Sequence, residues 1–130
     1  MVNNVELFSD AKASKALAPR TREELLKRAK VNYEEQPGDL KAVIAYADAL
    51  FNSHLFEETE KILQEACTIQ EDPDILYNLA FVSWINGKED SAKEFYRKVV
   101  KESRGTPLAK SAEYELWKMG EHIKAKWLEK

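Results

Sequence analysis

The residue types best suited to catalysis are few in this sequence, and their spacing does not favour a reaction. His54 and His122 both align with turns, and neither has Cys, Asp or Glu at the spacing of a metal site or an acid–base pair. The lone Cys67 follows Ala66 where a small apolar residue is expected, which favours an inert packed thiol over a nucleophile. The sequence has no glycine-rich phosphate loop and no G-x-S-x-G motif. We therefore expect no enzyme activity, no cofactor and no metal.

Composition and charge argue against several further classes of protein. The chain of 130 residues has 20 Lys and Arg and 23 Asp and Glu, mixed along its length. No basic stripe is available to neutralise a run of phosphates, so we expect no nucleic-acid partner. Residues 1–10 lack the pattern of a signal peptide, and no apolar run approaches the roughly 20 residues of a membrane span. A single cysteine also fits a reducing compartment. Together these features predict a cytoplasmic protein without membrane insertion.

The elements that carry these side chains are predicted to be amphipathic helices. Helix-start signals recur along the chain, and apolar residues follow each one at spacings of three and four. Thr21 and Glu24 have the spacing of a capping box, which predicts a helix ending at about Gln36. Proline at the first helical position supports two later starts, because its missing N–H costs nothing there. We expect about seven helices, beginning near Ser9, Thr21, Asp39, Phe56, Asp72, Glu89 and Thr106.

Helix starts and turns recur at a constant interval. Leu40, Pro73 and Thr106 are 33 residues apart. The same offset aligns three residues at one turn position, namely His54, Gly87 and Gly120. The repeated unit is helix, tight turn, helix, and such a unit buries its apolar face only by stacking on neighbouring units. The sequence therefore predicts an all-α repeat protein.

The unit that starts at Asp72 carries a recognisable pattern of side chains. It has a large residue, then Leu and a small residue, a glycine in the turn, and small, aromatic and small positions on the second helix. These residues are Leu76, Leu79, Ala80, Gly87, Ala92, Tyr96 and Val99. The pattern resembles the tetratricopeptide repeat, and the preceding unit matches it less fully. The resemblance implies an α-superhelix, or solenoid, of antiparallel helix pairs.

The resemblance covers residues 39–130, which we interpret as repeats with a C-terminal capping helix. Residues 1–38 match weakly and are interpreted as a degenerate N-terminal helical repeat or a partly ordered segment, within one domain overall. At the close-packing positions, Ala47 and Ala80 face Thr59 and Ala92. These small side chains allow paired helices to approach, because larger ones would hold the axes apart.

The resemblance also implies a binding surface. In tetratricopeptide arrays, the face of each first helix opposite its packing residues lines a concave groove. The corresponding positions here are Ile44, Asp48, Phe51 and Asn52, then Tyr77, Asn78, Phe81, Trp84 and Ile85, then Lys110, Tyr114, Trp117 and Lys118. Phe51, Trp84 and Trp117 share one position, so stacked units are predicted to set their rings side by side.

Such an aromatic surface predicts a partner. Soluble monomers rarely expose a contiguous apolar patch, and Trp and Tyr often anchor binding partners. We expect the groove to bind a protein or peptide, through an apolar segment or an amphipathic helix. Two alternatives stay open: a homodimer formed through the same rings, and cover by the terminal segments of the chain itself.

The sequence argues against the function of one subclass of the family, the co-chaperones that bind a terminal carboxylate. Some tetratricopeptide co-chaperones hold the terminal carboxylate of a chaperone tail with lysines, asparagines and an arginine. Only Asn78 occupies a matching position here; the other positions hold Ile44, Asp48, Pro107 and Ser111. These side chains supply no charge-assisted hydrogen bonds to a carboxylate. Lys110 and Lys118 remain candidates to contact an acidic flank of a partner.

Overall fold

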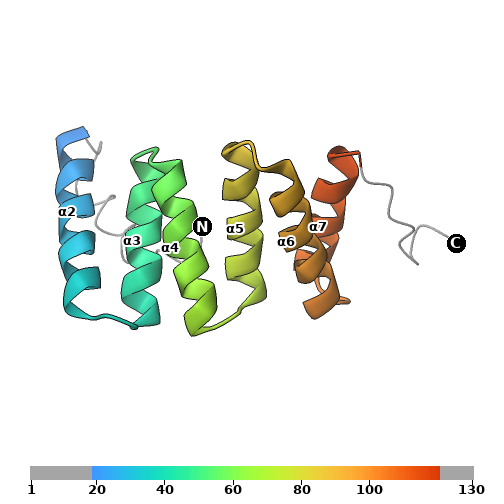
Figure 1. Cartoon of the computed structure of the whole chain (residues 1–130), viewed down its shortest axis with the longest axis horizontal. Coiled ribbons are helices and arrows are strands. Elements are labelled where there is room, and N and C mark those ends of the chain that lie inside the picture. Colours follow the sequence, from blue (N-terminus) through green and yellow to red (C-terminus); the bar gives the residue numbers. More distant parts are fainter. Residues whose placement is uncertain (1–18, 121–130) are drawn as a thin grey trace, which may run out of the picture. The chain divides into compact units, whose positions relative to one another are not determined.

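The structure, a computed structural model, describes residues 19–120, and these form six α-helices with no strand among them (Figure 1). The helices are α2 (Pro19–Glu35), α3 (Leu40–Asn52), α4 (Phe56–Ile69), α5 (Pro73–Ile85), α6 (Glu89–Glu102) and α7 (Pro107–Lys118). The prediction of an all-α protein is confirmed for this part of the chain. About seven helices were expected, and six are described. The helix expected from Ser9 and the capping helix after Gly120 lie outside the described residues.

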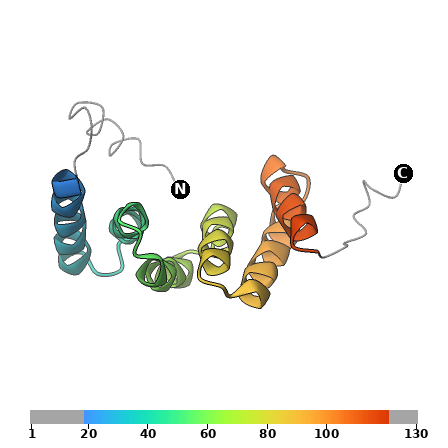
Figure 2. The same ribbon diagram turned by 90° about the horizontal axis from the view of Figure 1, so that it is seen from above.

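The chain divides into two compact units, Met1–Glu71 and Asp72–Lys130, and each is described by itself. In the first unit α3 contacts both α2 and α4. In the second unit α6 contacts both α5 and α7, and α7 also touches α5. Figure 2 shows α3 and α4 as one hairpin and α5 and α6 as another. The single domain and the boundary after residue 38 stay predictions.

Side-chain caps explain where three of the helices begin. The Asp39 carboxylate accepts a hydrogen bond from the backbone N–H of Ala42 at 3.2 Å. The Asp72 carboxylate accepts from the N–H of Asp74 at 2.8 Å, and the Thr106 hydroxyl accepts similarly at the start of α7. Each cap satisfies a backbone donor that has no partner within the helix. These three predicted starts are confirmed.

The capping box predicted at Thr21 is wrong. Helix α2 already begins at Pro19, so Thr21 lies inside its first turn and not at the cap. Proline at the first helical position has its φ angle preset for a helix, which favours this earlier start. The predicted end near Gln36 agrees with the observed end at Glu35.

The turns within the two hairpins share one backbone conformation. His54 has φ +62° and Gly87 has φ +80°, and both follow the last turn of a helix. The N–H of Leu55 donates to the carbonyl of Leu50, and the N–H of Lys88 donates to that of Ser83. These bonds, with those from His54 and Gly87 themselves, form the Schellman pattern that closes a helix with a left-handed residue. The alignment of His54 with Gly87 therefore has a local physical cause.

Small residues lie fully buried where the paired helices meet. Ala47, Thr59, Ala80 and Ala92 each expose 0% of their surface. The Thr59 hydroxyl donates to the Leu55 carbonyl at 2.7 Å, so its polar atom is satisfied within α4. Larger buried side chains surround these positions: Val43, Leu50 and Leu63 in the first unit, and Leu76, Leu79, Tyr96, Val99 and Leu116 in the second. The predicted close-packing residues are buried.

None of the helices described in residues 19–120 is long and apolar enough to cross a membrane.

Candidate binding surface on α5 and α7

The predicted groove positions on α3 are mostly covered. Asp48 is buried, with 1% of its surface exposed. Phe51 is half-buried and packs edge-on against Phe56, with ring centroids 5.3 Å apart. Ile44 is also half-buried, and Asn52 is exposed. The first unit thus presents no large exposed apolar side chain on α3.

Helix α5 exposes two aromatic rings one turn apart. Phe81 and Trp84 stack with centroids 6.4 Å apart and planes inclined by 29°. One turn earlier, Tyr77 is half-buried and meets the buried Tyr96 ring edge-on at 5.3 Å. The remaining predicted positions are Asn78, whose amide donates to the Asp74 carbonyl at 3.0 Å, and the half-buried Ile85.

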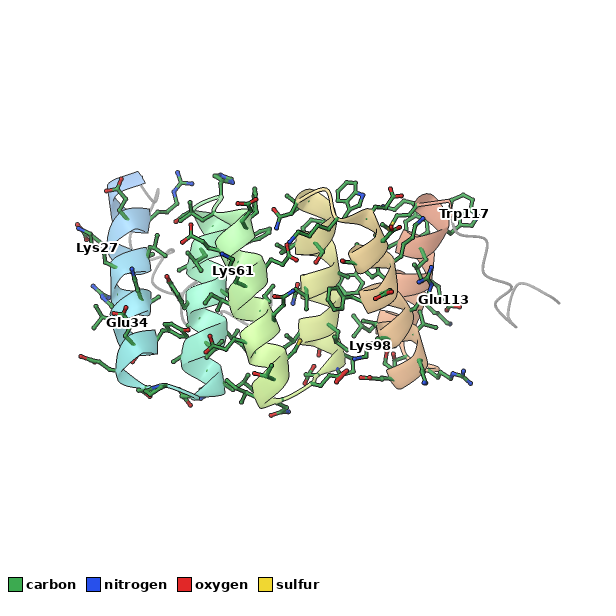
Figure 3. The ribbon with its side chains drawn as sticks, in the orientation of Figure 1. Lys27, Glu34, Lys61, Lys98, Glu113 and Trp117 are labelled. Carbon is green, nitrogen blue, oxygen red and sulfur yellow. The ribbon has the colours of Figure 1, made fainter. Side chains whose placement is uncertain are left out.

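Helix α7 repeats this arrangement with added charge. Tyr114 and Trp117 stack with centroids 6.2 Å apart and planes inclined by 22°. The Lys118 ammonium lies 4.9 Å from the centroid of the Tyr114 ring and 3.2 Å from Oε1 of Glu115. Lys110 is exposed one turn before Tyr114. Figure 3 shows Trp117 near the end of α7, projecting outward from the ribbon.

The two aromatic pairs occupy equivalent positions on neighbouring helices of one unit. Phe81 and Trp84 expose 38% and 51% of their surface, and Tyr114 and Trp117 expose 56% and 57%. We call these four residues the aromatic face. They supply four of the seven large apolar side chains exposed in the described part of the chain. Large apolar side chains that are exposed are thus concentrated on α5 and α7.

Electrostatic contacts connect the α5 positions to α7. Burial raises the pKa of Tyr77, Glu115 on α7 raises it further, and Lys118 lowers it. Burial also raises the pKa of Tyr96, and Glu115 adds to this shift. Glu115 therefore acts electrostatically on the tyrosines of α5 and α6, and Lys118 contacts the Tyr114 ring of the aromatic face. The buried phenols stay protonated at neutral pH and supply no base.

The aromatic face can bind a partner through burial of its rings and through stacking on them. Half-exposed rings lose solvent-exposed area when a partner covers them, and their faces accept stacking side chains. Phe51 belongs to the other unit, so the row of three rings through Phe51, Trp84 and Trp117 stays a prediction. Two of those residues, Trp84 and Trp117, are found at equivalent exposed positions.

One contact in the first unit was not foreseen from the sequence. The Tyr33 hydroxyl donates a hydrogen bond to Oε1 of Glu65 at 2.6 Å, and its ring packs at a tilt of 31° against that of Tyr46, with centroids 4.8 Å apart. The hydrogen bond and partial burial raise the pKa of Tyr33 to about 12. The two bonded residues are 32 positions apart, and only the folded chain brings them together.

None of the side chains considered for catalysis is on α5 or α7, the helices of the aromatic face. His54 is exposed in the turn before α4, with its ring 5.7 Å from that of Phe56. Cys67 is half-buried on α4. His122 lies outside the described residues. Comparison of the sequence with models of known protein families found no match, and a search of curated proteins found none either.

Proposed function

We propose that this chain is a non-catalytic interaction module with tetratricopeptide-like repeats, and that its aromatic face binds an apolar peptide or an amphipathic helix of another protein. The observation that carries the proposal is the exposure of Phe81, Trp84, Tyr114 and Trp117, each between 38% and 57% accessible on two helices that touch. Soluble proteins rarely leave such side chains clustered and uncovered without a binding role.

The tetratricopeptide-like arrangement is supported by local geometry. The hairpins α3–α4 and α5–α6 close through the same turn conformation at positions 33 residues apart, His54 and Gly87. The residues at the close-packing positions are fully buried in both hairpins. We propose that such hairpins stack into a superhelix, because a helix–turn–helix unit buries its apolar face only against neighbouring units.

Binding energy on this surface comes from burial. A Leu or Phe side chain that becomes fully buried contributes roughly 1.5–3 kcal/mol before the cost of ordering the partner. Tryptophan is enriched among interface hot spots, the positions where substitution by alanine weakens binding most. Trp84 and Trp117 are therefore the expected anchors, with Phe81 and Tyr114 beside them.

The decisive experiment is affinity capture with the intact chain beside a Trp84→Ala/Trp117→Ala variant. The proposal expects one or more proteins to be recovered by the intact chain and lost with the variant. Val31→Ala is a matched control, because Val31 is an apolar side chain exposed on α2, outside the aromatic face. Equal recovery with the double variant and the intact chain would contradict the proposal.

The same exposure favours a competing function, self-association of this chain as a structural homo-oligomer. Two copies that mate through the aromatic face would bury it without another protein. Sedimentation at micromolar concentration separates the two functions. A monomer at all concentrations eliminates self-association, whereas a dimer that dissociates on Trp84→Asp establishes it.

A further inference from the structure

The two helices of the aromatic face differ in charge at equivalent positions. At the offset of 33 residues, Lys110 on α7 corresponds to Tyr77 on α5, and Lys118 corresponds to Ile85. The ring pair of α5 is therefore flanked along its helix by Tyr77 and Ile85. The ring pair of α7 is flanked by the ammonium groups of Lys110 and Lys118.

The two lysines flank the ring pair along α7. Lys110 is exposed and precedes Tyr114 by one helical turn, on the same side of the helix. The Lys118 side chain is 47% exposed, and its ammonium group lies 4.9 Å from the Tyr114 ring centroid. A ligand that covers Tyr114 therefore meets positive charge at the edge of an aromatic surface.

Helices α5 and α7, as described, contain three acidic side chains. Glu115 is only 26% exposed and is held by Lys118. Its charge also raises the pKa of Tyr77 and Tyr96. Glu113 is half-buried, and Asp74 lies in the first turn of α5, at the far end of that helix from Trp84. Of the charged side chains described on α7, the two that are exposed are therefore Lys110 and Lys118, both positive.

The arrangement of rows on this face selects the shape of the ligand. Apolar rings are exposed on α5, and rings and ammonium groups are exposed on α7, a helix that contacts α5. A ligand that covers both helices therefore needs an apolar row and an anionic row. A helix presents such adjacent rows along its surface. A strand places successive side chains on opposite faces, and α5 and α7 offer no sheet edge for a strand to join.

From this complementarity we infer that the partner of the aromatic face is an acidic amphipathic helix. Its apolar side chains cover Phe81 and Trp84, and its Asp and Glu side chains lie against Lys110 and Lys118. The inference rests on the proposed binding function and specifies the class of partner. Basic amphipathic helices are disfavoured, because their charges would meet the two ammonium groups.

The test uses the full chain and three synthetic helical peptides of about 15 residues, a length at which isolated helices become marginally stable. The peptides share one row of Leu and differ only beside that row, where they carry Glu, Gln or Lys. Binding is measured by tryptophan fluorescence titration at low and high salt. We expect the Glu peptide to bind roughly tenfold or more tightly than the Lys peptide at low salt, with the ratio shrinking at about 1 M salt, where charges are screened within about 3 Å.

Charge reversal on the protein makes the test specific. Lys110→Glu/Lys118→Glu is expected to invert the order of the Glu and Lys peptides. Lys101→Glu/Arg104→Glu makes the same change in net charge at and just after the end of α6 and is expected to leave the order unchanged.

The outcomes separate this inference from the function it rests on. Equal binding of all three peptides, abolished by Trp84→Ala, would overturn the acidic class while supporting the aromatic face as a binding surface. Preference for the Lys peptide would also overturn the acidic class. No binding by any peptide would count against both proposals.

Discussion

The Tyr33 hydroxyl donates a 2.6 Å hydrogen bond to the Glu65 carboxylate, which joins α2 to α4. Helix α2 otherwise contacts its unit through α3. Tyr33 contributes to both attachments, because its ring also packs against Tyr46 of α3. This side chain is therefore central to holding α2 in place.

Tyr33→Phe is expected to lower the free energy of unfolding by about 1–2 kcal/mol, because it removes a hydrogen bond to a carboxylate and keeps the ring contact with Tyr46. Urea denaturation measures the loss. Glu65→Gln is the matched control, since its amide oxygen still accepts from the hydroxyl, and its loss should be smaller. A stability unchanged by Tyr33→Phe would show that the bond contributes nothing.

The stabilisation from Tyr33 is expected to depend on pH at the alkaline end. The folded-state pKa of Tyr33 is raised to about 12 from an ordinary value of 10. The stabilisation is therefore complete below about pH 10 and is lost as the pH rises toward 12, because the unfolded chain releases the phenolic proton first. Denaturation of the intact chain and of Tyr33→Phe across this range should show their difference shrinking. A constant difference would contradict the raised pKa.

His54→Gly is expected to stabilise the protein by about 1 kcal/mol. His54 has φ +62°, a conformation that costs a non-glycine residue roughly 1–2 kcal/mol, partly offset by the greater flexibility of glycine in the unfolded chain. Thermal denaturation should show a higher midpoint. Gly87→His is the reciprocal change, at φ +80° with open space around an added Cβ, and should destabilise by a similar amount. A lower midpoint for His54→Gly together with a higher midpoint for Gly87→His would refute the explanation.

Ser83→Ala is expected to raise the free energy of unfolding by about 1 kcal/mol. The Ser83 side chain is 0% exposed, and within the described residues its hydroxyl has no hydrogen-bond partner. Removing a buried, unsatisfied hydroxyl removes its desolvation cost. Ser103→Ala is the contrast, because the Ser103 hydroxyl donates to the Val99 carbonyl at 2.5 Å. Chemical denaturation should move the two variants in opposite directions, and a destabilised Ser83→Ala would contradict the prediction.

Trp84→Ala and Trp117→Ala are each expected to weaken binding of the captured partner by about 2 kcal/mol or more, if the proposed binding function holds. Both side chains are more than half exposed, so their removal should leave helicity by circular dichroism nearly unchanged. Titration of the captured partner measures the affinity. Affinity that stays the same in both variants, with helicity intact, would remove these residues from the binding surface.

The sequence alone determined the helices and most of their ends. Asp39, Asp72 and Thr106 act on backbone N–H groups two or three residues away, and the turn at His54 and Gly87 closes through bonds within six residues. Such interactions are local, so their residue types are sufficient evidence. The exception is the start of α2, where two local signals, Pro19 and Thr21, compete within the same turn.

Only the tertiary structure decided which side chains are covered. Phe51 and Trp84 are equivalent in sequence, yet Phe51 packs against Phe56 while Trp84 is about half exposed, because burial depends on the neighbours that each side chain meets. The bond from Tyr33 to Glu65 likewise joins residues that nothing in the local sequence connects. Periodicity places a residue on a face of its helix, and the packing of the other helices determines whether that face is exposed.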